Sequence, residues 1–524
     1  MGADRKRTPF FGGMEKTMLR VRKTTLAATM TLALMAALGL GGCSLFTPSL
    51  SEDTQSVVAK TDIKSSALVT EGKLTVALDT SNAPQAMTIA AGRGTYSLGR
   101  VQTPTLAMVC ARYWDHKRFT PEAFWQVHLS AEGTGEQTVK FSSLEKWKEK
   151  FPAEHIYNKV KAQPSLLVTK VECKEKVEDT PLLYDLTTLQ KEANAKHGFT
   201  AEKTLEIAQK LYEKKLITYP RTGSRYIPED VFAEIPKLLA FLGGYPEWIG
   251  KVPHRDRLTR RSVDNSKVTD HHALLPTTRR ADLSKMSAEE RQLWDLVVRR
   301  MLAAFYPPCE YDATRVITQV GEHTFRTTGR VVLQNGWRDV QPLETMPRKR
   351  KGKEEAEDKA LPPLQAGDTR TVHKAEVKED MTKPPAQHTD ASLLLAMENA
   401  GKELEDEALR EQMKGSGIGT PATRASIIER LVQVGYVQRK GKTLLATPKG
   451  IALIGIMPAE IASPETTGRW EKALDEITTG KQDPARFMEG IRKLSAFLVR
   501  YARENQKPAH FPEDARQKKF RAQQ

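Results

Sequence analysis

Strand-rich and helical stretches alternate along this chain of 524 residues. β-Branched runs within residues 120–180 suit half-buried strands, whereas residues 183–300 carry apolar side chains at helical spacing. Strand signals return from about 310 to 378, and the pattern is helical again from 389 to 500. The order predicts a mixed α and β, multidomain protein. Its chain would leave one β domain, build a helical one and return, rather than form four successive domains.

The basic charge belongs to the main body of the chain. Lysine and arginine exceed the acidic residues by 16, and residues 1–80, with 10 basic and 7 acidic side chains, account for only 3 of that excess. A surplus of this size makes a polyanion, most simply nucleic acid, a plausible partner. The alternative is a soluble basic protein without such a partner.

The four cysteines form no CxxC pair, which argues against a zinc ribbon and against a dense disulfide framework. Cys43 is a separate case. Basic residues at 20, 22 and 23 precede an uncharged stretch from Thr24 to Gly42, and this order is typical of a secretory signal. The ending Leu40-Gly41-Gly42-Cys43 resembles the lipobox of bacterial lipoproteins, which predicts lipidation of Cys43. The alternative is a short membrane or buried helix.

Residues 216–228 hold the sharpest motif, with Tyr219 followed directly by Pro220 and Arg221. Because Pro220 disfavours a helical conformation at the residue before it, we expect Tyr219 at a helix end or on an extended stretch. A free phenol, with a pKa of about 10, is a poor nucleophile at neutral pH. The nearby cations Arg221 and Arg225 would favour the phenolate and neutralise charge on a phosphoryl group. A tyrosine packed at a turn is the alternative.

A second motif, Asp270-His271-His272-Ala273, follows about fifty residues later. Adjacent side chains point in different directions on a helix or a strand, so one metal ion is poorly placed to bind both histidines. A phosphate contact is the better functional interpretation. A histidine that caps a helix or satisfies the core is the structural alternative.

Two further segments suit phosphate binding at a helix entrance. Residues 95–105 place Ser97, Arg100, Gln102 and Thr103 just ahead of an apolar helix. In residues 415–424, Thr420 is a predicted N-cap, Pro421 the first helical residue, and the helix should end at Gly435. An ordinary N-cap is the alternative in both places. A hairpin over 436–445 would complete a winged-helix-like unit with a basic wing.

The stretch from Gly435 to Thr443 imitates a nucleotide-binding P-loop. Five residues rather than four separate its glycines, and it follows a helix rather than a strand. We therefore reject nucleoside triphosphate binding and expect no use of ATP.

In this order the segments resemble type IA DNA topoisomerases, and Tyr219-Pro220-Arg221 followed by His271-His272-Ala273 is most similar to the topoisomerase III branch. The resemblance spans roughly residues 81–500. It implies a torus in which one DNA strand is cleaved and rejoined through a 5′-phosphotyrosine, without ATP. It makes Tyr219, Arg221 and His271 the catalytic residues. It also assigns DNA contacts, preferentially to single strands; these would come from Ser97, Arg100, Gln102, Thr103, His272 and Arg424.

The same family uses Mg²⁺ held by a glutamate and a DxDxE cluster in its first domain, and no DxD sequence occurs in residues 1–80. We therefore expect a partial torus without that acidic domain, without metal ligands and without zinc. Full turnover is then in question. The alternatives are a truncated single-stranded DNA-binding remnant and a surface lipoprotein with an inactive topoisomerase body. Action on DNA implies the cytoplasm, whereas the signal implies membrane attachment through Cys43. The oligomeric state stays open.

The predicted domain boundaries follow from these assignments. They are a signal segment (1–43), a solute-binding-protein-like head or linker (44–80), a helical single-strand groove segment (81–119), the first part of a strand-rich gate domain (120–180), a helical domain with the nucleophile (181–282), the return to the strand-rich domain (283–383), a helical and winged-helix-like domain (384–500) and a basic tail (501–524).

Overall fold

The computed structural model describes residues 64–70, 73–79, 98–133, 137–248, 250–254, 258–341, 360–402, 406–413 and 417–504. Ser97 and the predicted signal segment with Cys43 lie outside these ranges. The chain divides into two compact units, one comprising residues 114–386 and the other residues 1–113 with 387–524. The mixed α and β class predicted from the sequence is confirmed.

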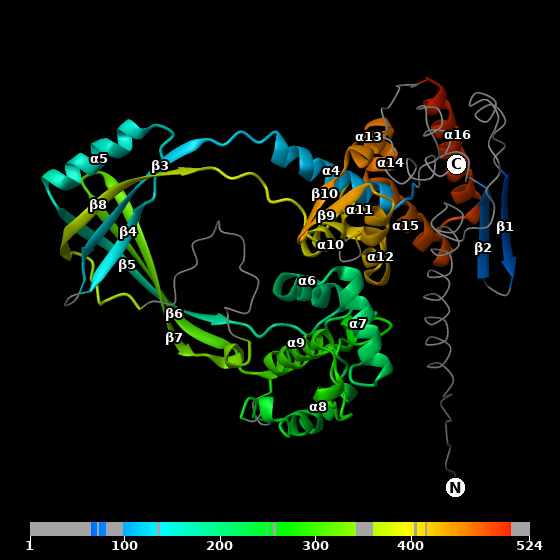
Figure 1. The fold of residues 1–524 in the computed structure, drawn as a ribbon, viewed down its shortest axis with the longest axis horizontal. Coiled ribbons are helices and arrows are strands. Elements are labelled where there is room, and N and C mark those ends of the chain that lie inside the picture. Colours follow the sequence, from blue (N-terminus) through cyan, green and yellow to red (C-terminus); the bar gives the residue numbers. More distant parts are fainter. Residues whose placement is uncertain are drawn as a thin grey trace, which may run out of the picture. The chain divides into compact units, whose positions relative to one another are not determined.

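A closed antiparallel barrel forms part of the unit 114–386, in the strand order β3-β4-β7-β6-β5-β8. Alternation builds it: β3 buries Val127, Leu129 and Ala131 at every second position. The helix α5 (Lys150–Ala162) packs its buried residues against this core, and Figure 1 shows it beside the strands. The strands are β3 (Ala123–Glu132), β4 (Thr138–Ser143), β5 (Ser165–Glu178), β6 (Cys309–Val320), β7 (His323–Gln334) and β8 (Thr369–Met381).

A helical domain is inserted in the chain between β5 and β6. Its helices share one apolar core that includes Leu189, Leu211, Leu239 and Val297. The elements are α6 (Leu186–His197), α7 (Ala201–Glu213), α8 (Glu229–Leu242) and α9 (Ala288–Phe305), with 3₁₀ turns η1 (Pro246–Trp248), η3 (Asn265–Lys267) and η4 (Leu283–Lys285). Because α9 belongs to this core, the return to the barrel begins at Cys309, later than the predicted boundary at 283.

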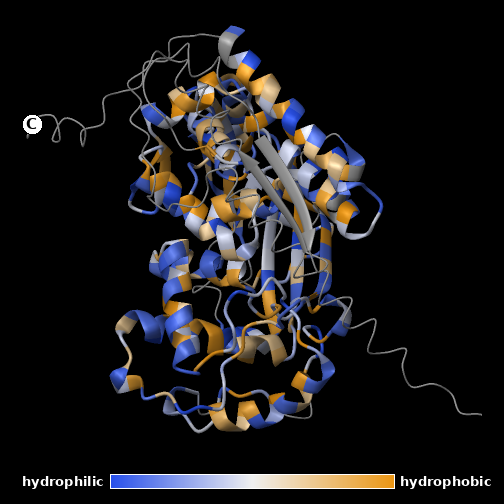
Figure 2. Cartoon of the chain, turned by 90° about the vertical axis from the view of Figure 1, so that its right-hand side faces the viewer, coloured by the Kyte–Doolittle hydropathy of each residue, from blue (hydrophilic) through white to orange (hydrophobic). Residues whose placement is uncertain are grey.

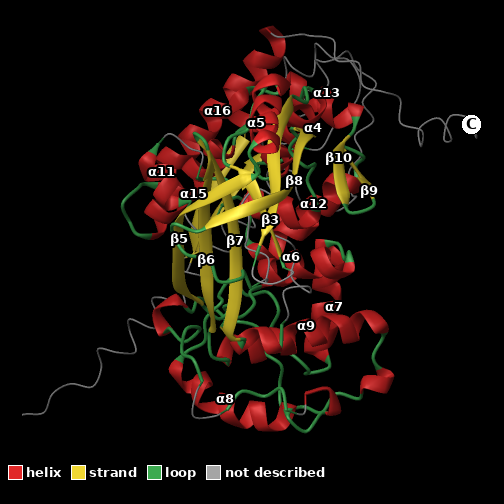
Figure 3. Ribbon diagram, turned by 90° about the vertical axis from the view of Figure 1, so that its left-hand side faces the viewer, coloured by secondary structure: helices red, strands yellow, loops and turns green. Residues whose placement is uncertain are grey.

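The two ends of this insertion lie side by side. β5 and β6 pair antiparallel until Glu178 meets Cys309, and Figure 3 shows β5, β6 and β7 running together. The carboxylate of Glu178 forms ion pairs with Arg330 and Arg338, and its carbonyl accepts a 3.1 Å hydrogen bond from the Trp337 indole. These contacts hold the 3₁₀ turn η5 (Gly336–Asp339) against the point where the chain leaves and re-enters the barrel.

The second unit is mainly helical. The predicted helix after Thr420 is α12, capped by Thr420, and Gly435 adopts a left-handed φ of 76° beyond its end. The predicted hairpin follows it as β9 and β10. The elements are β1 (Lys64–Thr70), β2 (Lys73–Asp79), α4 (Gln102–Lys117), which reaches the unit boundary, α10 (Asp390–Glu398), α11 (Glu407–Gln412), α12 (Pro421–Gln433), β9 (Val437–Lys440), β10 (Thr443–Ala446), α13 (Pro448–Ile456), α14 (Ala459–Ala462), α15 (Pro464–Thr478) and α16 (Pro484–Glu504).

The helices are amphipathic rather than uniformly apolar. In Figure 2 orange and blue residues alternate along them, as expected for helices with one side in a protein core. Across the described ranges, no helix combines the length and apolar character needed to cross a membrane.

A buried ion pair links the first and last helices of the insertion. The guanidinium of Arg300 on α9 pairs with Glu192 on α6 and stacks on the Tyr184 ring at 4.3 Å. Gln341 donates to the same carboxylate at 2.8 Å. Burial alone would raise the pKa of Glu192, but the charges of Arg300 and Lys196 outweigh it and hold that pKa below its usual value. Within the fold, ionised Glu192 is thus favoured over its protonated form.

We expect Arg300→Met to lower the free energy of unfolding by roughly 3–5 kcal/mol, because it leaves the Glu192 carboxylate buried without its main partner. The depressed pKa of Glu192 contributes stability above its unfolded-state pKa, and this contribution is lost as the pH falls through the folded-state value. The difference in free energy of unfolding between parent and Arg300→Met should therefore become smaller in acid. Urea unfolding at neutral and at acidic pH measures this difference. Lys237→Met, which removes an exposed ion pair, is the control; an equal effect there would contradict the prediction.

Candidate active site around Tyr219

The end of α7 determines how the chain continues toward Tyr219. The Leu216 amide donates to the Leu211 carbonyl at 2.9 Å and the Lys215 amide to the Tyr212 carbonyl at 2.7 Å, which is the Schellman arrangement of a helix end. Lys215 has a φ of 59° and is the only non-glycine residue with a positive φ in the described part of the chain. A left-handed backbone conformation is uncommon for a residue other than glycine, so surrounding contacts must hold Lys215 in it.

Those contacts come from the segment that follows the histidine pair. The Thr277 hydroxyl donates to the Lys215 carbonyl at 2.5 Å, and the Thr277 amide to the Leu216 carbonyl at 3.1 Å. The Thr218 amide donates to the Leu275 carbonyl at 2.9 Å, and the Thr218 hydroxyl accepts from the Leu275 amide at 3.0 Å. Two segments far apart in sequence therefore pair like short strands, and Tyr219 follows directly.

The loop after Tyr219 is also hydrogen-bonded to the segment that contains His271. The Thr222 hydroxyl donates to the His271 carbonyl at 2.9 Å, and the Ala273 amide donates to the Tyr226 carbonyl at 2.9 Å. The Thr222 carbonyl in turn accepts a bond from the Leu186 amide at the start of α6. The backbone on both sides of Tyr219 is thus fixed to the backbone that carries His271.

These constraints bring three aromatic rings together. The ring centroids of Tyr219 and His271 lie 4.6 Å apart with a 52° angle between their planes. Tyr212 meets Tyr219 edge to face at a centroid distance of 5.4 Å. Tyr219 is half-buried and His271 is exposed, so a substrate can reach the pair. The sequence analysis predicted Tyr219 and His271 as site residues. It did not predict Tyr212, which lies earlier in the chain, in the last turn of α7.

The other residues predicted for this site have different surroundings. Arg221 is exposed two residues after Tyr219. His272 is half-buried and its Nδ1 lies 2.7 Å from the Ala273 carbonyl, so that nitrogen is engaged by the backbone. The structure therefore leaves His271, rather than His272, facing the tyrosine ring.

A surface ion pair lies beside the loop. Lys267 binds Asp264 at 2.8 Å and places its ammonium 4.9 Å from the centroid of the Tyr226 ring. Hydrogen bonds from Lys267 and Ser266 lower the pKa of Asp264 to about 2. Across the described residues, no three His, Cys, Asp or Glu side chains are grouped so that they could hold a metal ion.

Four of the residues predicted to contact DNA lie in the described part of the second unit, and all four are buried there. The Arg100 side chain is 2% exposed and pairs with Glu471 at 2.8 Å, and the Thr103 hydroxyl accepts a bond from the Gly99 amide. Gln102 is also buried at the start of α4. The Arg424 side chain is buried as well, and its Nε donates to the Ile418 carbonyl at 3.2 Å. Thr103 and Arg424 thus bond to backbone groups nearby in the sequence, whereas Arg100 pairs with a side chain far along the chain.

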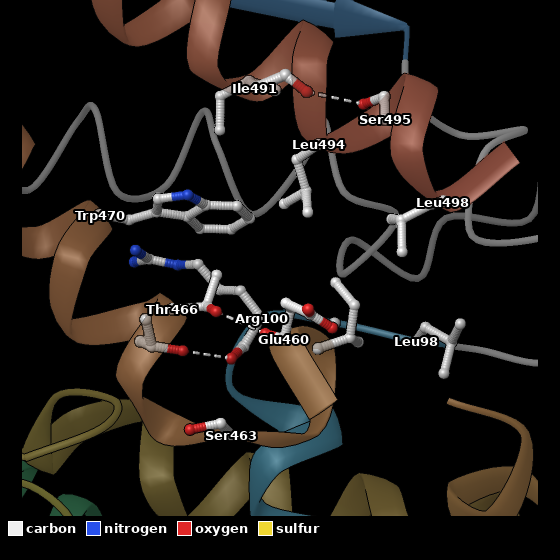
Figure 4. A pocket seen from close by; sticks show the side chains of 13 residues that line it. Leu98, Arg100, Glu460, Ser463, Thr466, Trp470, Ile491, Leu494, Ser495 and Leu498 are labelled. Atoms are coloured by element: carbon white, nitrogen blue, oxygen red, sulfur yellow. Dashed lines mark hydrogen bonds between the residues drawn. The ribbon is translucent and has the colours of Figure 1, made fainter. Parts of the chain in front are cut away.

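A small cavity of about 50 Å³ adjoins Arg100 within the second unit. In Figure 4 the Arg100 side chain runs beneath the Trp470 ring. The Arg100 carbonyl accepts a 2.6 Å hydrogen bond from the Thr467 hydroxyl. The cavity walls are mainly apolar, with side chains from Leu98, Ile461, Trp470, Ile491, Leu494 and Leu498. Trp470 and Glu471 thus pack against the segment that contains Arg100.

Comparison with known proteins gives a consistent result. A family model described as DNA topoisomerase matches residues 79–489. DNA topoisomerase 3 from a strain of Bacillus cereus is 36% identical over 410 residues, covering 76% of this chain and 56% of the relative. DNA topoisomerase 3 from Bacillus subtilis is 35% identical over 416 residues, covering 77% and 56%. The chain therefore spans little more than half the length of these relatives.

A solved structure agrees in fold. Full-length topoisomerase I from Thermotoga maritima superposes with a TM-score of 0.60 at 23% identity, covering 80% of this chain and 68% of that one. The family match over residues 79–489 and the identity to DNA topoisomerase 3 show that the chain belongs to the DNA topoisomerase family, and they confirm the type IA, topoisomerase III resemblance inferred from the motifs around Tyr219 and His271.

Proposed function

We propose that this chain cleaves and rejoins a single DNA strand through a covalent bond to Tyr219, and so changes DNA topology without ATP. The observation that carries the proposal is the apposition of Tyr219 and His271, whose ring centroids lie 4.6 Å apart on backbone segments tied together by hydrogen bonds. A fixed nucleophile beside a polar side chain that can bind a phosphate is the arrangement that phosphoryl transfer needs.

In the cleavage step the Tyr219 oxygen attacks the scissile phosphorus. A bond from that oxygen to phosphorus forms and the bond from phosphorus to the 3′ oxygen of the strand breaks. The loss of the phenolic proton is balanced by protonation of the departing 3′ oxygen, which becomes a 3′ hydroxyl. The 5′ phosphate stays on Tyr219, which conserves the bond energy for the reverse reaction. His271 would bind a non-bridging oxygen as charge develops there, and the exposed cation Arg221 would neutralise the phosphate.

Magnesium is expected from family membership, and Mg²⁺ prefers carboxylate oxygens. In the described part of the chain no three or more His, Cys, Asp or Glu side chains are grouped so that they alone could hold a metal ion. We therefore derive no step from the metal. A single-stranded DNA-binding protein that does not complete the reaction is the competing function, and it is supported by the same basic charge of +16.

Denaturing electrophoresis with end-labelled single-stranded DNA and magnesium tests the nucleophile. We expect a covalent adduct from the parent protein and none from Tyr219→Phe, because phenylalanine retains the ring but lacks the attacking oxygen. DNA binding by the two proteins should be equal. An adduct that persists in Tyr219→Phe would place the nucleophile elsewhere, and no adduct from either protein would favour the DNA-binding alternative.

The role of His271 has its own test. We expect His271→Ala to slow adduct formation by roughly 10²- to 10³-fold, the effect seen when one stabilising donor is removed from a transition state. His272→Ala is the matched control, since the His272 Nδ1 is occupied by the Ala273 carbonyl, and its effect should be much smaller. Single-turnover rates of adduct formation measure both. Equal rates for parent and His271→Ala would remove His271 from the mechanism.

We also propose membrane attachment through Cys43, on the basis of the signal-like order of residues 20–43. Metabolic labelling with a radioactive fatty acid in a bacterial host should label the full chain and not Cys43→Ser. Cys173→Ser, which removes an exposed cysteine elsewhere, is the control. An unlabelled parent protein would contradict attachment and leave the proposed reaction untouched.

A further inference from the structure

We propose that Tyr212 is a stacking platform for one base of the bound DNA strand, next to the nucleophile. The inference rests on the proposed function and adds a substrate contact that the sequence motifs did not indicate. It starts from the position of Tyr212, which touches the Tyr219 ring edge to face at 5.4 Å with a 76° angle between the planes.

Tyr212 is exposed although it belongs to an amphipathic helix with a buried side. On α7 the apolar residues Ile207, Ala208 and Leu211 are buried in the core of the insertion, whereas Tyr212 is 39% exposed. Tyr212 is neither in that core nor among the partly buried side chains packed against it. An aromatic side chain that the core does not use, beside a reactive group, is a candidate for substrate contact.

The platform is attached to a rigid support. The Tyr212 carbonyl accepts the Lys215 amide at 2.7 Å, and the Lys214 ammonium binds Glu290 at the start of α9 at 2.6 Å. The last turn of α7 is thereby tied to a second helix. The backbone that carries Tyr212 is therefore fixed, and its ring rests against the Tyr219 ring, so little further freedom is lost when a base stacks on it, which favours binding.

Phosphate and base contacts are then divided between different side chains. Arg221 and His271 are exposed on the phosphate side of the proposed reaction, while Tyr212 offers an aromatic surface adjoining the Tyr219 ring. A base flanking the scissile phosphate is joined to it through one sugar, and so can reach this surface. Stacking tolerates any base, because every base has a π face, so the contact would add affinity without strict sequence preference.

The test uses equilibrium binding in the Tyr219→Phe background, where no covalent bond can form. Two labelled oligonucleotides of equal length and charge are compared by fluorescence anisotropy, one with its bases and one a sugar–phosphate chain without bases. Tyr212→Ala and Tyr212→Leu should bind the base-bearing strand about 5- to 150-fold more weakly than the background protein. Tyr212→Phe should bind it normally, and all four proteins should bind the baseless strand alike.

The leucine variant separates stacking from support of the Tyr219 ring. Leucine is a good helix former and keeps apolar contact with Tyr219, but it cannot stack on a base. The proposal would be overturned if Tyr212→Leu or Tyr212→Ala bound the base-bearing strand as well as the background protein does. It would also be overturned if the variants lost affinity equally for both strands, or if the background protein did not prefer the base-bearing strand.

The adduct assay with Tyr219 intact distinguishes this failure from failure of the proposed function. An adduct from the parent, together with binding that is insensitive to Tyr212, would refute the stacking platform alone. Tyr212-dependent binding to the base-bearing strand without any adduct would support the platform and refute strand cleavage.

Discussion

The antiparallel pairing of β5 with β6, which ends where Glu178 meets Cys309, is the constraint on which the candidate site depends. The contacts described above for Tyr219 and its flanking backbone are all made by residues between these two. Because both ends of this insertion are paired with each other, it can fold as a unit with a core of its own. Arg330 and Arg338 neutralise the Glu178 carboxylate at the junction, and the Trp337 indole donates to the Glu178 carbonyl. The entropy of closing so long a loop rises only slowly with length, so one well-held junction suffices.

Within the insertion, hydrogen bonds between backbone groups, together with those made by the hydroxyls of Thr218, Thr222 and Thr277, set the position of Tyr219. Lys215 adopts a left-handed conformation that costs a non-glycine residue about 1 kcal/mol or more. The Schellman bonds of α7 and the bonds from Thr277 offset this cost. This conformation turns the chain out of the helix, so that it pairs with the segment that follows His271. Tyr219 therefore meets His271 through two backbones in register, and both rings stay accessible.

Much of this architecture could be predicted from local sequence patterns. Alternating β-branched runs and helical apolar spacing gave the order of the elements, and Thr420-Pro421 with Gly435 gave the bounds of α12. Pro220 correctly indicated that Tyr219 is not helical. The helix α5 inside the strand-rich segment 120–180 was not predicted, and neither was the left-handed Lys215, because no glycine indicated it. The burial of Arg100 and Arg424 depends on Glu471 and Ile418, which are distant along the chain or lie in a loop, and composition carries no signal for such contacts.

The capping box of α9 has a mechanical consequence for a tyrosine that carries DNA. Glu290 accepts hydrogen bonds from the Ser287 amide and from the Lys214 ammonium, so one carboxylate joins the beginning of α9 to the end of α7. In the proposed covalent intermediate, tension in the held strand pulls on the backbone at Tyr219. That load passes into two helices at once, through the peptide chain to α7 and through the Glu290 bridge to α9, whose far end leads into β6. The whole folded insertion therefore anchors the broken strand, and the force is not borne by a single loop.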